Sequence, residues 1–314
     1  MADMLSRTAA SLYWMGRYME RAEFTTRLIE ATIRLGSLSA RSGTDEAWKS
    51  ALAVVGATGP VGAAGESLGA FSARRHLALS KDNPSSIRSC LERARDNARA
   101  ARNVLTQEVW EAVNRAWLII RDRTSPGGTR ATLSLVEDLK AETRGFEGAL
   151  ARMLRSEAYW FMRLGSVIER GDNTARLLDV KYYLLLPEGE QVGGTLDRDQ
   201  WMTILQIVSG QTAYRVIYKQ PLKPWLVADL LIYRRELPRS LAASAAETVS
   251  LLGEFGSRSG RQGEADRLAR RRLGRLESGN IDALIQRGLH ESLQRLVEEN
   301  AMLDRTVAKQ FRFP

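Results

Sequence analysis

The chain has 314 residues with a formal net charge of +9, and 44% of its residues are hydrophobic while 26% are charged. This balance excludes a disordered chain and supports a core of substantial size. No apolar run approaches the roughly 18–20 residues that span a bilayer, so we expect no membrane-spanning helix.

The beginning of the chain carries charges where a secretory signal would carry an apolar core. Arg7, Arg17, Glu20 and Arg21 interrupt this segment, so we expect no signal peptide. Cys90 is the one cysteine, so no disulfide can form within these residues, and this fits a reducing compartment. Together these features predict a cytoplasmic protein.

The long segments favour helix almost throughout, because Ala, Leu, Arg and Glu dominate them and only 8 prolines occur. In chain order we expect helices at about 6–35 and 45–56, one that carries Cys90 to about 104, then 107–122, one from about 133, and one that contains 159–186. Further helices are expected at about 199–209, 224–234 and 238–252, an arginine-rich one after 263, and a last one at 281–307. The Gly-rich stretches 56–69 and 187–194 are predicted loops, and Asn83 or Ser85 is expected to cap the helix that carries Cys90. No segment alternates with period two, so an all-α fold with essentially no sheet is predicted.

A twelve-residue pattern occurs twice, as "GRYMERAEFTTR" at 16–27 and "GSVIERGDNTAR" at 165–176. Two weaker matches follow in the same order, since "WKSAL" resembles "WMTIL" and "NPSSI" resembles "LPRSL". Glu20 and Glu169 are 149 positions apart, and Trp48 and Trp201 are 153 apart. Matches at such nearly constant spacing predict an internal duplication. We therefore expect one domain over 1–314, built from halves at about 1–150 and 151–310 that pack around a pseudo-two-fold axis as a helical bundle.

The repeated pattern places charges in one narrow stripe of a helix, at about 100° per residue. The stripes consist of Gly16, Glu20, Glu23 and Arg27 in the first copy and Gly165, Glu169, Asp172 and Arg176 in the second. Apolar residues border the first stripe on both sides, which a merely solvated face would not show. With the adjacent Arg21 and Arg170, these charged residues form the candidate site.

Two hypotheses account for the stripes. In the structural one, which we prefer, the acids and arginines pair across a buried helix interface, and the glycines let two backbones approach closely. In the functional one, the stripes face each other and line one polar cleft where Glu20, Glu23, Arg27, Glu169, Asp172 and Arg176 converge.

A catalytic alternative rests on two carboxylates three residues apart in each copy. These are Glu20 and Glu23, and Glu169 and Asp172, which resemble the paired carboxylates of all-helical nucleotide pyrophosphatases that hold Mg²⁺ against a diphosphate. Arg27 and Arg176 lie one turn away and would neutralise these acids. Neither His76 nor His290 belongs to a recognisable ligand pair, and no nucleophile–base set can be assembled. The sequence therefore favours a protein without catalytic residues or a cofactor, with Mg²⁺ as the alternative.

An arginine-rich segment at 261–275 contains Arg267, Arg270, Arg271, Arg272 and Arg275. We interpret it as an exposed amphipathic helix with Leu268 and Leu276 turned inward, and a surface for an anionic partner is the alternative. Elsewhere the basic excess lies beside Glu and Asp along helices, so we expect no nucleic-acid binding.

Several segments resemble the bacterial alpha-E family, a helical domain named for a Glu-Arg motif. They are "MLSRTAASLYWMGRYMERAE" at 4–23, "DNPSSI" at 82–87, "ARDNAR" at 94–99, "VWEAVN" at 109–114 and "RGDNTARLLDVKYY" at 170–183. Leu237 stands where the family tends to have Asn before a proline, which puts a helix cap of the second half in question.

The resemblance implies a wholly helical fold and a genetic neighbourhood. Alpha-E proteins are encoded beside, or fused to, circularly permuted ATP-grasp ligases and transglutaminase-like peptidases. The function implied is that of a non-catalytic helical accessory protein in a bacterial peptide-ligation or amide-forming system.

Overall fold

The computed structural model describes residues 4–38, 41–57, 69–183 and 194–314, and helices make up most of this part of the chain. No strand occurs within these ranges, which confirms the predicted all-α fold. Nor is any described helix long and apolar enough to cross a membrane. The helices are α1 (Ser6–Leu38), α2 (Arg41–Val54), α3 (Ala70–Leu79), α4 (Ile87–Ala100), a 3₁₀ turn (Arg102–Val104), α5 (Gln107–Arg121), α6 (Thr129–Arg152), α7 (Glu157–Tyr183), α8 (Thr195–Ile207), α9 (Gln211–Tyr218), α10 (Pro224–Tyr233), α11 (Leu241–Ser259), α12 (Glu264–Ser278), α13 (Ile281–Gln286) and α14 (Leu289–Gln310).

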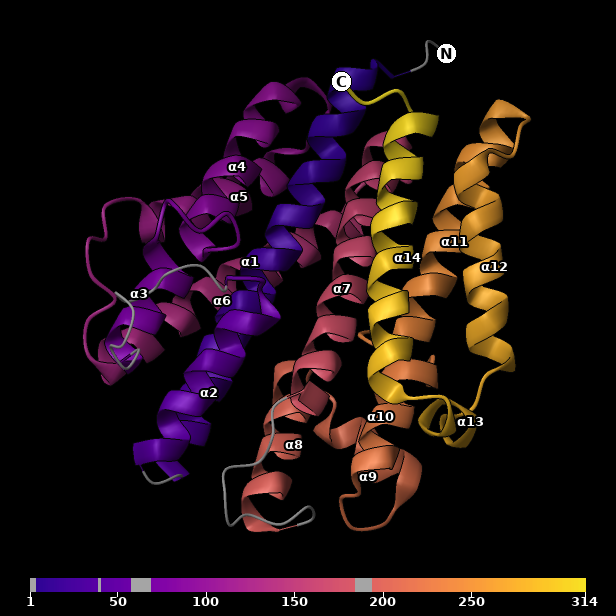
Figure 1. Cartoon of the computed structure of the whole chain (residues 1–314). Helices are drawn as coiled ribbons and strands as arrows, with labels where there is room; N and C mark the ends of the chain where they lie inside the picture. Colours follow the sequence, from indigo (N-terminus) through magenta and orange to yellow (C-terminus); the bar gives the residue numbers. More distant parts are fainter. Residues whose placement is uncertain (1–3, 39–40, 58–68, 184–193) are drawn as a thin grey trace.

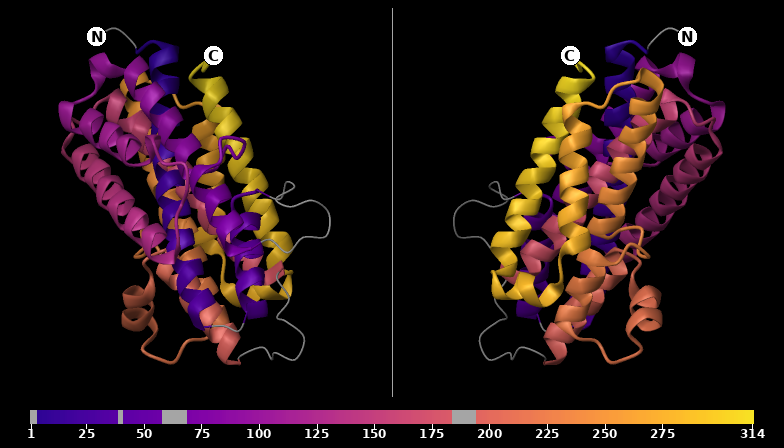
Figure 2. Two further views of the ribbon diagram at one scale, coloured as in Figure 1. Left: turned by 90° about the vertical axis from the view of Figure 1, so that its left-hand side faces the viewer. Right: turned by 90° about the vertical axis from the view of Figure 1, so that its right-hand side faces the viewer.

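Two long helices, α1 and α7, lie side by side at the centre of the molecule, and the other helices pack around them (Figure 1). On one side α4 and α6 pack against α1, with α5 behind them. On the other side α11 and α14 pack against α7, with α12 behind them. Both termini lie at the same end of the molecule (Figure 2), where the Tyr13 and Phe313 rings are 5.3 Å apart. The central pair therefore carries both copies of the repeated pattern.

The glycine that heads each stripe lies where the backbones of α1 and α7 touch. A Cβ on Gly16 would lie 2.0 Å from the carbonyl oxygen of Met162, and a Cβ on Gly165 would lie 2.0 Å from that of Tyr13. Ser166 adds a hydrogen bond across the contact, donating to the Gly16 carbonyl at 3.2 Å. The contact is reciprocal, and only residues without a side chain fit it.

Three helices were not predicted as such, and α2, α6, α8 and α11 begin or end several residues away from the predicted bounds. Neither α3 nor α9 was expected, because each is short and follows a glycine-rich or turn-like stretch. The helix expected over 281–307 is two helices, since Gly288 adopts a φ of +91° between α13 and α14. The predicted loops at 56–69 and 187–194 lie largely outside the described residues.

Serines cap the helices that follow the two proline turns. Ser86, rather than Asn83 or Ser85, caps α4 by accepting a hydrogen bond from the Ser89 amide. In the second half Ser240 caps α11 in the same way, accepting from the Ala243 amide, so the missing Asn does not remove the cap. The two caps occupy matching places in "NPSSI" and "LPRSL". Duplication of the two halves stays a prediction, which these matching caps support.

We expect Gly16→Ala to destabilise the protein by about 1–3 kcal/mol or more, because the new methyl group meets backbone atoms that cannot rotate away. Gly148→Ala is the matched control, since it lies in α6 with no atom within 4 Å of the added Cβ. The control should be neutral or stabilising by up to about 1 kcal/mol through helix propensity. Urea denaturation of the two variants measures the difference, and equal stabilities would contradict the close approach.

Candidate functional site

Glu169 of the second copy lies at the centre of the α1–α7 contact and binds two arginines of the first helix. Arg17 donates from Nε to its Oε2 at 2.8 Å. Arg21 donates from Nε to Oε1 at 2.5 Å and from Nη2 to Oε2 at 2.9 Å, a bidentate pair. Glu169 is 1% exposed. Both of its oxygens are therefore fully engaged away from solvent.

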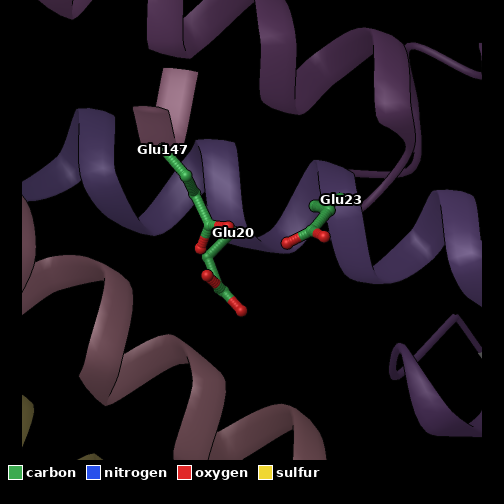
Figure 3. A group of neighbouring side chains, drawn as sticks. All are labelled: Glu20, Glu23 and Glu147. Carbon is green, nitrogen blue, oxygen red and sulfur yellow. The ribbon is translucent and has the colours of Figure 1, made fainter. Parts of the chain in front are cut away.

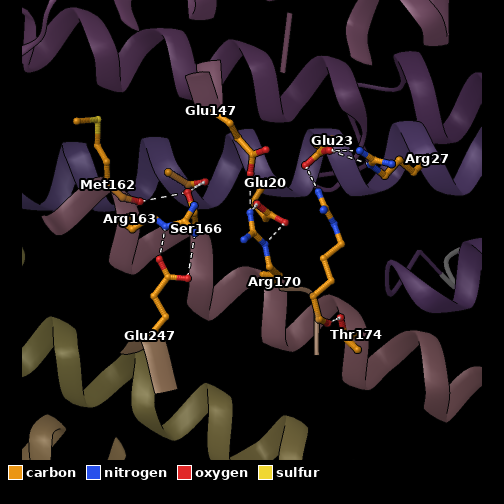
Figure 4. Close-up of polar contacts among 12 residues, drawn as sticks. Glu20, Glu23, Arg27, Glu147, Met162, Arg163, Ser166, Arg170, Thr174 and Glu247 are labelled. Atoms are coloured by element: carbon orange, nitrogen blue, oxygen red, sulfur yellow. Dashed lines mark hydrogen bonds and ion pairs between the residues drawn. The ribbon is translucent and has the colours of Figure 1, made fainter. Parts of the chain in front are cut away.

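Glu20 of the first copy makes the reverse contact, to an arginine of the second helix. Arg170 donates from Nε to Oε1 at 2.9 Å and from Nη2 to Oε2 at 2.6 Å (Figure 4). The same guanidinium reaches Glu147 of α6 at 2.7 Å. Both Glu20 and Arg170 are buried. Each Glu-Arg dipeptide thus supplies a glutamate to one pair and an arginine to the other.

The arginines keep both buried glutamates ionised. Burial by itself would raise the pKa of Glu169, but the charges of Arg21 and Arg17 and their hydrogen bonds outweigh it and lower the pKa from 4.5 to about 2. The same balance of burial against Arg170 lowers the pKa of Glu20. The arginine contacts therefore compensate for the burial of the two carboxylates. Compensated, buried ion pairs of this kind are typical of a packed helix interface.

Glu23 forms a second cluster one turn further along α1. Arg27 donates from Nε to its Oε1 at 2.8 Å, and Arg239, which precedes α11, donates to Oε2 at 2.7 Å. Arg27 also donates at 2.7 Å to Ser209, which lies just after the end of α8 and has a φ of +56°. Glu23 is buried, so this cluster fastens α1 to the ends of two other helices.

Asp172 and Arg176 in the second copy match Glu23 and Arg27, and they pair at 2.7 Å. Their environment is more open, because the Arg176 side chain is 41% exposed. Asn300 of α14 lies nearby, donating to the Ile168 carbonyl at 3.0 Å and to Asp172 at 3.4 Å. The two copies therefore differ at this outer position.

The functional hypothesis of one polar cleft stays a prediction, and the observed pairing of the charges does not support it. Each of the six charged groups is bound to an opposite charge, Glu20 and Glu23 lie close to each other, and none of Glu20, Glu23, Glu169 and Asp172 lines a described cavity. Arg27 alone of the candidate residues borders one, of about 290 Å³, together with Arg34 and Lys140. The structural hypothesis fits the observed pairing.

The four carboxylates of the magnesium alternative do not gather either. In the described part of the chain, the carboxylates close enough to share one ion are Glu20, Glu23 and Glu147 (Figure 3). Arg170 already binds Glu20 and Glu147, and Arg27 and Arg239 bind Glu23. The positive charge that a metal would supply is therefore already present as guanidinium.

Sequence reasoning missed several partners in these clusters. Arg17 could have been found, because it precedes Arg21 by one turn on the same helix. Glu147, Arg239 and Asp304, which binds Arg17 at 2.6 Å, come from distant segments with no shared pattern. His290 lies 2.6 Å from Asp179, a contact between α14 and α7 that no motif indicated.

The arginine-rich segment forms α12 much as predicted, with one correction. Leu276 is buried and Leu268 half-buried, while Arg267, Arg270, Arg271 and Arg275 are exposed. Arg272 is not exposed: it is 5% accessible and donates to Asn300. Burial lowers its pKa to about 10, more than Glu299 and Asp172 raise it. The exposed stripe therefore contains four arginines rather than five.

Comparison with known proteins gives one family. The model of a family called Alpha-E, described as a predicted alpha-helical domain with a conserved ER motif, matches residues 4–311. No curated protein and no solved structure matches the chain. The two Glu-Arg dipeptides at the centre of the fold, at 20–21 and 169–170, agree with that description.

We expect Glu169→Gln to cost about 3–5 kcal/mol at pH 7, because it leaves Arg21 without its anion and buried Arg17 with Asp304 alone. The folded-state pKa is depressed, so the stabilisation by the ionised carboxylate is complete above about pH 4.5 and is lost as the pH falls through about 2. The shift from 4.5 to about 2 corresponds to about 3 kcal/mol. The stability difference between wild type and variant should therefore shrink on acidification.

Urea denaturation between pH 7 and pH 3 measures that difference. Glu277→Gln is the control, since its carboxylate is 48% exposed and pairs with an exposed arginine at 3.2 Å. The control should stay within about 0.5 kcal/mol of wild type at pH 7. A Glu169→Gln deficit that is small or independent of pH would contradict the buried pairing.

Proposed function

Because this chain belongs to the Alpha-E family, we propose that it is a non-catalytic helical accessory protein of a bacterial ATP-grasp system that forms peptide or amide bonds. In this proposal it works in the cytoplasm as one domain that docks on a circularly permuted ATP-grasp ligase, with a transglutaminase-like protein as a second partner. In this proposal the Glu-Arg motif stabilises the helical scaffold that docks on the ligase, and it does not react with substrate.

The observation that carries the proposal is the state of the two motif glutamates. Glu20 and Glu169 are both buried, and each accepts hydrogen bonds on both oxygens from arginines of the opposite helix. A general base or metal ligand must reach its proton, ion or substrate. Carboxylates held in this way support a scaffold, and the family match over 4–311 supports treating the whole chain as that scaffold.

The remaining nucleophile candidate supports the same view. Cys90 is fully buried, and burial raises the pKa of its thiol to about 12, with a smaller opposing effect of Arg21. A reactive cysteine needs an accessible thiolate, which this environment disfavours. Chemistry in the proposed system would therefore belong to the ligase.

We expect the protein to co-purify with the ATP-grasp protein encoded beside it, and to change the rate of ATP-dependent product formation by that ligase. Co-expression followed by size-exclusion chromatography tests the complex, and a coupled ADP assay tests the rate. A matched arm with the transglutaminase-like protein tests the second partner. Absence of a complex at micromolar concentration, with ligase activity indifferent to the added protein, would remove the proposal.

The alternative is a Mg²⁺-dependent phosphoanhydride hydrolase, and the grouping of Glu20, Glu23 and Glu147 is the observation in its favour. Under the scaffold proposal, millimolar Mg²⁺ or Mn²⁺ should leave the melting temperature unchanged, because arginines already neutralise these acids. A bound ion at about 100-fold excess over its Kd would stabilise the protein by about 2.7 kcal/mol. A clear metal-dependent shift together with phosphate release from a nucleotide would establish the alternative.

A further inference from the structure

A cleft of about 650 Å³ opens at the end of the molecule where both termini lie. Its walls come from the beginnings of α1 and α7, the end of α11 with the turn into α12, and the end of α14. The volume falls within the range of about 300–1,000 Å³ that ligand sites occupy. None of the charged pairs of the α1–α7 contact borders it, so it is separate from the Glu-Arg motif.

Three phenylalanines form the apolar side of this cleft. Phe161, Phe255 and Phe311 all line it, and each ring packs against the other two at centroid distances of 4.5, 4.9 and 4.8 Å. Phe161 and Phe255 are nearly buried, so they offer a rigid surface rather than open ring faces. Such a surface suits a large apolar side chain.

Arginines form the opposite rim. Arg258 also lines the cleft, and its charge is neutralised by Glu157, with which it forms an ion pair at 3.2 Å. Arg261 and Arg312 line it as well and are exposed, and no side-chain partner in the described part of the chain neutralises either. The cleft therefore carries an excess of positive charge beside its apolar surface.

Arg312 occupies a backbone position that normally favours glycine. Its φ is +52°, and the amides of Arg312 and Phe313 bond back to the carbonyls of Lys309 and Ala308. This is the Schellman ending of a helix, whose left-handed residue is usually Gly. An arginine there is strained relative to glycine, so glycine is the substitution that removes this side chain without a cost in backbone conformation.

A second hollow, of about 380 Å³, continues from the cleft around the turn between α11 and α12. The two share Gly256, Arg261 and Gln262. Arg270 and Glu254 border the second hollow. The combined surface therefore carries Arg312, Arg261 and Arg270 against Glu254, while its other acid, Glu157, is paired with Arg258. An extended ligand fits this continuous concave path better than a compact one.

We propose that this cleft binds an acidic peptide segment, with one large apolar side chain on the phenylalanine surface and flanking carboxylates on Arg261, Arg312 and Arg270. Charge complementarity and the extended path support a peptide. A nucleic acid would need open aromatic faces for base stacking, and here two of the three rings are nearly buried. The inference does not depend on the ligase partnership, because a synthetic peptide tests it.

The test is fluorescence anisotropy with a fluorescein-labelled peptide of sequence Asp-Asp-Phe-Asp-Asp and the full chain at low ionic strength. Two further peptides replace Phe by Ala, or every Asp by Asn. We expect saturable binding of the first peptide and at least about fivefold weaker binding of the other two. Added salt should weaken the binding, since it screens exposed charges.

The decisive variant is Arg312→Gly, because glycine relieves the backbone strain and should leave the melting temperature equal or higher. It should weaken peptide binding about tenfold, the usual effect of losing a charge-assisted hydrogen bond. Lys219→Gly is the matched control, since Lys219 also ends a helix with a positive φ, of +51°, but lies outside both hollows. Arg261→Ser provides an independent loss of charge in the cleft.

Three results would overturn the proposal: no saturable binding up to millimolar peptide, equal weakening by Lys219→Gly and Arg312→Gly, or equal binding of the peptide without Phe. A labelled oligothymidylate that binds as tightly as the peptide, with the same loss in Arg312→Gly, would assign the surface to nucleic acid instead. Peptide binding that survives in wild type while no ligase complex forms would leave this inference standing and remove only the proposed function.

Discussion

The reciprocal ion pairs between α1 and α7, in which each buried glutamate binds arginines of the opposite helix, are the interaction on which the rest of the fold depends. A charge inside a protein is tolerated only when a partner and further hydrogen bonds replace the lost water. Here Glu20 takes its partner from α7 and Glu169 takes its partners from α1. The glycines at 16 and 165 make this possible, because they bring the two backbones into contact and set the distance that the arginine side chains must span. The outer helices then pack on a central pair whose register is already fixed.

Much of this arrangement could be predicted from the sequence. The repeated spacing of Gly, Glu and Arg, with apolar residues on both flanks, indicates a buried charged stripe, and Glu20 and Glu169 are indeed buried. Helix was predictable from composition, since no segment alternates with period two. What the pattern lacks is the identity of partners: Glu147, Arg239 and Asp304 contact the motif from segments far apart in the chain. Long-range pairing is decided by tertiary packing, which local periodicity does not encode.

The errors in the predicted elements have local physical causes. Gly288 divides the last predicted helix because its positive φ cannot continue an α-helix, yet the leucine spacing on both sides remains helical. Arg272 lies among arginines whose pattern indicates an exposed face, but it falls on the same side of α12 as Ala265, Ala269 and Leu276 and is therefore buried. Conversely, Arg312 and Ser209 stand where glycine would relieve strain, and no helix propensity identifies such positions. Such positions can be identified only once the backbone conformation is known.

The reciprocal pairing at the centre also constrains which substitutions either Glu-Arg motif can accept. Each glutamate depends on an arginine of the other Glu-Arg helix, so the effect of a substitution in one motif depends on the residues of the other. The two motifs therefore cannot substitute for each other, because loss of either one leaves a buried charge of the other without its partner. At the outer positions, Glu23 and Asp172 each pair with an arginine of their own helix and differ in their further contact, which is Arg239 for Glu23 and Asn300 for Asp172. Substitutions at the inner residues are therefore energetically coupled across the two helices, whereas those at the outer positions act mainly within one helix and its own neighbours.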